Sequence, residues 1–205
     1  MTIPILSLIL LCPVVAVLLL FFVPDGRDKT VRWISLSFSV VAMFLSTWMF
    51  IAYDRAAAGF QFAEQYAWLP GLNSTYHVGV DGVGATLVLL NAIVMLTGVL
   101  TSFSIDFRVK EYFILFLLLV SGVFGSFICL DFLLFFIFFE VAVLPMYLLI
   151  GIWGSTNREY AALKLTLMLL AGSGLVFAGL IMTYYTSAVR SFDFSKKTRW
   201  NIQSI

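Results

Sequence analysis

The chain has few charged residues and few side chains that bind metals. Only 11% of its 205 residues are charged, against about 25% in a soluble domain. Its two cysteines stand apart in apolar sequence, and its single histidine, His77, has no cysteine or histidine partner for a metal site. No iron–sulfur, haem or zinc spacing occurs, so we expect no metal and no redox cofactor on this chain. A net charge of +1 gives no reason to expect nucleic acid as a partner.

Apolar residues make up 62% of the chain, which predicts an all-α integral membrane protein. A spanning helix needs about 20 apolar residues, and six stretches reach that length. We expect transmembrane helices at about residues 3–23, 31–53, 82–103, 112–130, 132–153 and 158–185. They would form one helical bundle over residues 1–190. The stretch 54–81 is amphiphilic and too polar to span. Residues 191–205 read as a polar tail, or as the start of a loop towards a missing helix.

Basic residues in the loops predict the orientation in the membrane, because cytoplasmic loops are rich in lysine and arginine. The loops after the first, third and fifth predicted helices hold Arg27, Lys29, Arg32, Arg108, Lys110 and Arg158, and the loops after the second and fourth hold only Arg55. This asymmetry places the N-terminus outside the cytoplasm. The four basic residues of the tail would then also lie outside, against the rule.

Glu140 is a carboxylic acid in one of the most apolar stretches of the chain. It follows Asp131 by nine residues, which places it about 13 Å along its helix and close to mid-membrane. A charged side chain there costs roughly 2.5–3.5 kcal/mol by insertion scales, and residues retained at such a cost usually belong to an ion or proton pathway. The alternative is a protonated acid that hydrogen-bonds a neighbouring helix. We expect Glu140 to carry protons.

Lys164 is the second charge that we expect to be buried. The short loop before residue 158 makes the fifth and sixth helices an antiparallel hairpin, in which Lys164 and Glu140 differ in depth by about 10 Å. A direct salt bridge is therefore not expected, although water could connect the two. The alternative is a lysine whose ammonium extends to the interface.

Three further residues have expected structural roles. Pro145 removes a backbone hydrogen bond one turn after Glu140, which either opens a hydrated break or simply kinks the helix. Asp131 and Asp81 directly precede helices, where an aspartate serves as the N-cap.

Three segments resemble one known family. They are WLPGLNSTYHVGVDGVGATLVLL (68–90), FFIFFEVAVLPMYLLIGIWG (135–154) and REYAALKLTLMLLAGS (158–173). In this order they resemble the antiporter-like subunit M of respiratory complex I, the bacterial counterpart of mitochondrial NADH dehydrogenase chain 4. The similarity covers most of residues 60–190. The same wider family includes multisubunit cation/proton antiporters, hydrogenase-linked complexes and the photosynthetic NDH complex.

The resemblance implies a proton-translocating subunit of an NADH:quinone oxidoreductase. Glu140 matches the essential glutamate of the family's fifth helix, and Lys164 matches a lysine at the start of its sixth helix. The family fold has about fourteen helices, so this chain corresponds to its first part. The lysine of the family's seventh helix, which works with the glutamate, has no counterpart in these residues.

The resemblance also implies the surroundings of the chain. Flavin, iron–sulfur clusters and quinone are expected on partner subunits, and the sister subunits L and N are expected as neighbours in the bilayer. A bacterial inner membrane is the expected location. The alternatives are a subunit of a multisubunit cation/proton antiporter, or of a related hydrogenase or photosynthetic NDH complex.

Overall fold

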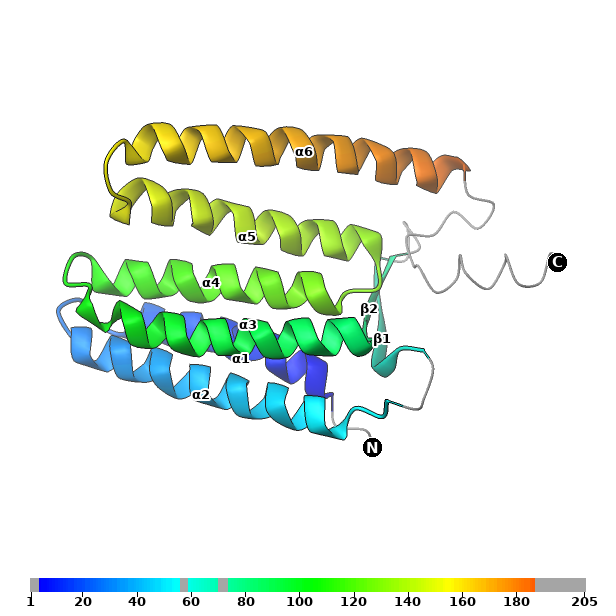
Figure 1. The fold of residues 1–205 in the computed structure, drawn as a ribbon, viewed down its shortest axis with the longest axis horizontal. Coiled ribbons are helices and arrows are strands. Elements are labelled where there is room, and N and C mark those ends of the chain that lie inside the picture. Colours follow the sequence, from blue (N-terminus) through cyan, green and yellow to red (C-terminus); the bar gives the residue numbers. More distant parts are fainter. Residues whose placement is uncertain (1–3, 56–58, 70–73, 187–205) are drawn as a thin grey trace.

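Six long helices run side by side in the computed structural model, which describes residues 4–55, 59–69 and 74–186 (Figure 1). All six are long and apolar enough to cross a membrane, so the all-α membrane fold is confirmed. The helices are α1 (Ile5–Phe22), α2 (Asp28–Ala52), α3 (Gly82–Thr101), α4 (Val109–Ile128), α5 (Phe132–Trp153) and α6 (Arg158–Thr186). The predicted tail, 191–205, lies outside the described residues.

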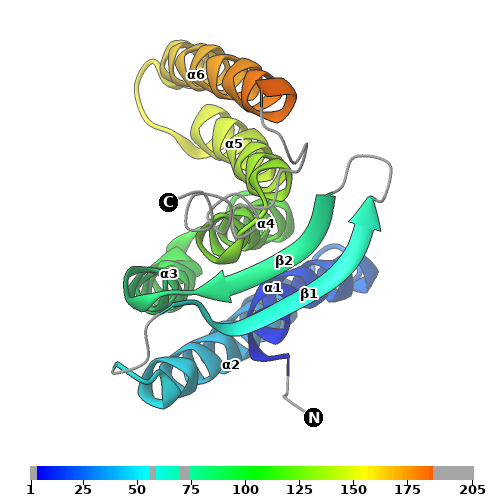
Figure 2. The ribbon, with the colours of Figure 1, turned by 90° about the vertical axis from the view of Figure 1, so that its right-hand side faces the viewer.

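The core lies among the first four helices. α4 is at its centre and packs against α1, α2, α3 and α5. Phe113, Leu117 and Phe124 of α4 are fully buried there. α5 covers the outer side of α4, and α6 covers α5, so that Figure 2 shows α5 and α6 extending away from the group of four. α6 is therefore the least covered helix, because only 6% of the residues in its most apolar stretch are buried.

A two-stranded hairpin crosses one end of the bundle, where α1, α3 and α5 begin (Figure 2). Strands β1 (Gln61–Leu69) and β2 (Ser74–Val80) are antiparallel. The outer edge of β2 pairs in turn with the link between α4 and α5, because Val78 bridges Cys129 and the Leu130 amide donates to the His77 carbonyl at 2.9 Å. The sequence predicts an amphiphilic stretch here and does not identify the strands.

Acidic side chains at this end hold the helix starts. Asp131 is fully buried, and its Oδ1 accepts from the amides of Leu133 (2.9 Å) and Leu134 (3.2 Å) at the start of α5. Its Oδ2 accepts from the Thr75 amide of β2 at 3.2 Å. Asp81 caps α3 in the same manner, by accepting from the Gly84 amide at 2.6 Å. Both aspartates thus occupy the N-cap positions that the sequence predicts.

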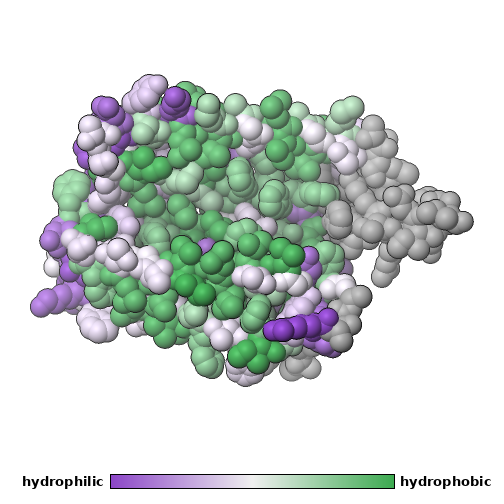
Figure 3. All heavy atoms as spheres, in the orientation of Figure 1, coloured by the Kyte–Doolittle hydropathy of each residue, from purple (hydrophilic) through white to green (hydrophobic). Residues whose placement is uncertain are grey.

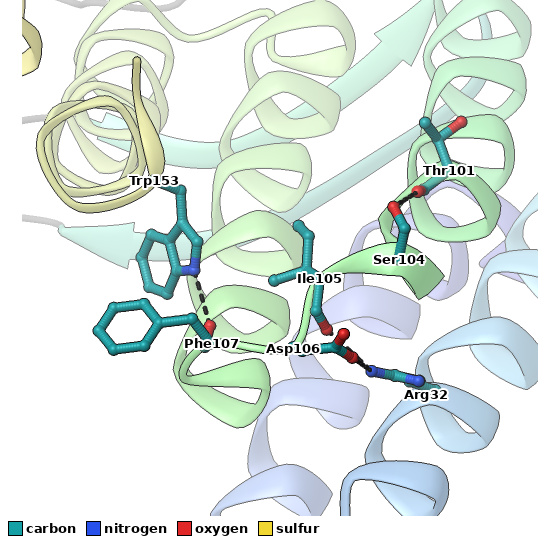
Figure 4. A network of polar contacts seen from close by, with 7 residues as sticks. All are labelled: Arg32, Thr101, Ser104, Ile105, Asp106, Phe107 and Trp153. Carbon is teal, nitrogen blue, oxygen red and sulfur yellow. Dashed lines mark hydrogen bonds and ion pairs between the residues drawn. The ribbon is translucent and has the colours of Figure 1, made fainter. Parts of the chain in front are cut away.

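Ion pairs hold the loops at the opposite end together. Arg32 of α2 lies 3.0 Å from the Asp106 carboxylate and also donates to the Ile105 carbonyl at 2.8 Å (Figure 4). The Trp153 indole donates to the Phe107 carbonyl at 2.9 Å, which attaches the end of α5 to the same loop. Apolar side chains cover the surface between the two polar ends (Figure 3). This charged end carries the basic residues from which the sequence predicts the cytoplasmic side.

Candidate functional site

Glu140 lies in the middle of α5, and one of its carboxyl oxygens has no partner among the residues that the structure describes. The residue is half-buried, while its Oε1 is enclosed and makes no hydrogen bond within the part of the chain that the structure describes. A buried polar atom without a partner costs about 1–3 kcal/mol, so such an atom calls for an explanation by function, by water or by a further partner.

The face of α5 that carries Glu140 packs against α6. Two contacts define this face: the rings of Phe136 and Phe177 stack with centroids 4.9 Å apart, and a side-chain carbon added at Gly151 would lie 3.8 Å from the Ala162 Cβ. Glu140 is four residues after Phe136 and eleven before Gly151. Both spacings return to the same side of a helix with 3.6 residues per turn. Glu140 therefore points towards α6 and away from the core of four helices.

The opposite face of α5 is fixed against α4 by close backbone contact. A side-chain carbon at Gly122 of α4 would lie 2.8 Å from both the Ala142 nitrogen and the Phe138 carbonyl oxygen of α5. Two helix backbones can approach this closely only where one of them carries glycine. Because Ala142 is two residues after Glu140, this contact sets the depth at which the carboxyl sits.

Pro145 is buried in α5 five residues after Glu140. A proline inside a helix has no amide to donate, so the carbonyl of Val141 loses its usual helical partner. α5 nevertheless continues as one helix from Phe132 to Trp153. The structure thus places a weakened turn beside the carboxyl, within an unbroken helix.

Lys164 is exposed, although the sequence predicts that it is buried. It lies on α6, the outermost helix, and its Nζ is 5.8 Å from the centroid of the Tyr160 ring. The contact between Gly151 and Ala162 makes Lys164 level with Leu149, nine residues from Glu140. This corresponds to about 13 Å along the helix axis, slightly more than the sequence predicts. Glu140 and Lys164 are therefore not brought together.

Cys129 lies in the link before α5, beside the capped start of that helix. Burial, and then the nearby Asp131 carboxylate, raise the pKa of the Cys129 thiol, which favours its neutral form. Among the described residues, no three histidine, cysteine or acidic side chains gather in a way that could hold a metal ion.

Comparison with known proteins points to one group. The protein family described as "NADH:quinone oxidoreductase/Mrp antiporter, TM" matches residues 130–204. NADH-quinone oxidoreductase subunit M of Rhodobacter capsulatus is 36% identical over 199 residues, covering 92% of this chain and 38% of the relative. NAD(P)H-quinone oxidoreductase chain 4 2 of Microcystis aeruginosa is 36% identical over 195 residues, covering 94% of this chain and 35% of the relative.

Solved structures share the fold. A chain of respiratory complex I from Thermus thermophilus with bound NADH superposes with a TM-score of 0.78 at 27% identity, over 92% of this chain and 38% of that one. A chain of an archaeal membrane-bound sulfane sulfur reductase superposes with a TM-score of 0.74 at 17% identity, over 93% of this chain and 39% of that one, which shows the fold alone. The chain thus spans about two fifths of the length of the proteins that it matches.

Proposed function

Because the chain is a homologue of the subunit M and chain 4 group of NADH-quinone oxidoreductases, we propose that it is a proton-translocating membrane subunit of such a complex. The observation that carries this proposal is the enclosed Oε1 of Glu140, which has no partner within the described ranges and lies in the middle of a spanning helix. An ionisable group inside a membrane protein is a functional candidate in its own right, and the homology gives that candidate a reaction.

The proposed mechanism is a proton exchange at Glu140. Burial favours the neutral form of a carboxyl, and an approaching cation favours the charged form. A cation that moves towards Glu140 would release its proton, and a cation that withdraws would allow another to bind. Quinone reduction elsewhere in the complex would drive this movement. Flavin, iron–sulfur clusters and quinone would be held by partner subunits.

The cation that acts on Glu140 would come from outside the described residues. Lys164 is too far along the helix axis to act directly, so it would contribute through water at a later point of the path. The uncovered side of α6 is where further helices would pack. We propose that a longer chain, or a second polypeptide, supplies those helices, and that sister subunits of the L and N type lie beyond them in a bacterial inner membrane.

The substitution Glu140→Gln tests this function in native membranes. Glutamine keeps the size and polarity of the side chain but cannot exchange a proton, so NADH-driven proton pumping should be largely abolished while the complex still assembles. Pumping is measured with a pH-sensitive dye, and assembly by native gel electrophoresis. Glu159→Gln, at the exposed start of α6, is the matched control and should pump normally. An assembled Glu140→Gln complex that pumps at the normal rate would refute the proposal.

A cation/proton antiporter subunit is the second candidate, because the matching family includes the Mrp antiporters. In that case Glu140 would exchange protons against a metal cation, with no electron transfer. Purification of the native assembly separates the two functions. Flavin and iron–sulfur absorbance that co-purifies with the chain supports the oxidoreductase, and sodium-dependent proton movement without NADH supports the antiporter.

A further inference from the structure

The two contacts between α5 and α6 also identify the residue that lies opposite Glu140. In an antiparallel pair, each step forward along one helix is matched by one step back along the other. Glu140 is four residues after Phe136, and Ser173 is four before Phe177, the residue that Phe136 contacts. Glu140 is also eleven before Gly151, and Ser173 is eleven after Ala162, the residue that Gly151 approaches. Both contacts independently place Ser173 at the depth of Glu140.

Ser173 also faces α5 rather than the outside. It is 7% exposed, although α6 is largely uncovered and a side-chain carbon at the neighbouring Gly172 or Gly174 would meet nothing within 4 Å. It lines an apolar groove of 280 Å³ together with Phe136 and Phe139 of α5. Glu140 does not line this groove, but Phe136 lies one turn before it on α5, so Ser173 faces the part of α5 next to the glutamate.

The Ser173 hydroxyl is free to change its partner. It donates to the Leu170 carbonyl of its own helix at 3.1 Å, a local bond that leaves both oxygen lone pairs available. A hydroxyl can donate to a charged carboxyl and accept from a neutral one by rotating about its bond to carbon. It thereby fits both states of a group that gains and loses a proton.

We propose that Ser173 is the hydrogen-bonding partner of Glu140 during proton transfer, either directly or through one water molecule. This inference rests on the proposed function of Glu140 and adds a positioning residue from α6. The hydroxyl would donate to Oε1 in the charged state and so hold the carboxyl towards α6. The proton itself is exchanged at Glu140, so Ser173 contributes by holding and orienting that group.

The test compares variants at residue 173 in native membranes, with proton pumping and the infrared carbonyl band of the protonated glutamic acid as readouts. The band is assigned by its loss in Glu140→Gln. Ser173→Ala should lower the pumping rate by about two- to tenfold, the effect of one lost hydrogen bond, and should shift the band. Ser173→Thr keeps the hydroxyl and should leave the pumping rate and the infrared band close to those of the wild type. Ser173→Val has the shape of threonine but no hydroxyl, so it should behave like Ser173→Ala.

A second buried serine provides the matched control. Ser39 of α2 is fully buried and donates to the Leu36 carbonyl at 2.8 Å, the same local bond in a helix that does not face Glu140. Ser39→Ala should leave pumping and the band unchanged. If Glu140→Gln abolishes pumping while Ser173→Ala and Ser173→Val match the wild type in both readouts, the inference about Ser173 is wrong and the function of Glu140 stands. If Glu140→Gln pumps normally, the proposed function itself fails, and with it any relay role of Ser173.

Discussion

Asp131 and Glu140, nine positions apart at the start and in the middle of α5, differ in how their carboxyl groups are hydrogen-bonded. Asp131 is fully enclosed and accepts three backbone hydrogen bonds, so it cannot change partners unless the start of the helix opens. Glu140 has an enclosed oxygen without any partner among the described residues. The first arrangement fixes a helix end, and the second leaves a group free to exchange. This difference separates a structural acid from the acid that we propose to exchange protons.

The exposed ammonium of Lys164 gives a prediction at the scale of one side chain. If it forms part of the proton path beyond Glu140, Lys164→Ala should reduce pumping only in part, because it lies about 13 Å from the level of Glu140 along the helix axis and would act through water. Lys164→Arg keeps the charge and serves as the control. Proton pumping normalised to NADH oxidation is the measurement. An unchanged pumping rate in the alanine variant would indicate that the Lys164 ammonium only extends to the membrane–water interface and takes no part in proton transfer.

Asp131 gives a second prediction at this scale, concerning stability. Asp131→Ala removes the acceptor of three amides, two of them in the first turn of α5, and should lower the free energy of unfolding by about 2 kcal/mol. Asp81→Ala removes the acceptor of one capping amide and should cost about 1 kcal/mol. Thermal unfolding in detergent compares the two. Equal losses would mean that the bond to Thr75 and the second capping bond of Asp131 contribute nothing.

Helices and strands differ in how far the sequence predicts them. The six helices are predictable because each is a long apolar run, and the acids at 81 and 131 mark two of their starts. The hairpin is missed because irregular pairing interrupts its alternation between Gln61 and Glu64 and again between Ala67 and Leu69. Phe62 adopts a left-handed backbone at the first of these irregularities. Aromatic residues at 66 and 68 keep the two-residue period of a strand, and they are the signal that could have revealed it.

The close approach of α4 and α5 gives a prediction at the scale of elements. Gly122→Ala would set a methyl group against the backbone of α5, so the helices must separate, at a cost of about 1–3 kcal/mol. Because Ala142 lies two residues after Glu140, pumping should fall as well. Gly82→Ala at the start of α3 adds the same methyl group at an ordinary contact distance, 3.7 Å from the Tyr53 hydroxyl, and serves as the control. Equal stability and equal pumping in the two variants would contradict the close contact.

The whole molecule shows why the candidate site could be predicted only in part. Glu140 can be identified from the sequence alone, because an acidic residue within an apolar stretch is unusual whatever lies next to it in the fold. The exposure of Lys164 depends on what covers α6, and this chain spans only about two fifths of the length of its relatives. Ser173 carries no signal of its own, because a serine in a helix is common and its place opposite Glu140 emerges only from the register of two helices.

The separation of polar groups between the two ends gives a prediction for the whole molecule. The six basic loop residues gather at the end opposite the hairpin, so the hairpin should face away from the cytoplasm. Single cysteines test this in a background with both native cysteines replaced by serine. Gln65→Cys on β1 should react with an impermeant maleimide in intact cells, and Ser155→Cys in the loop before α6 should react only after the membrane is opened. The reverse pattern would invert the orientation.

The bond from Asp131 to Thr75 joins residues 56 positions apart, and this has a consequence for biosynthesis. At ribosomal speeds of about 5–20 residues per second, the strands are made roughly 3–11 seconds before the aspartate. During this interval β2 has an open edge, since Cys129 and Leu130 are not yet there to pair with it. The edge of β2 can pair only after the link that follows α4 has been synthesised. The contact between β2 and the start of the helix that carries Glu140 can therefore form only after residue 131 has been made.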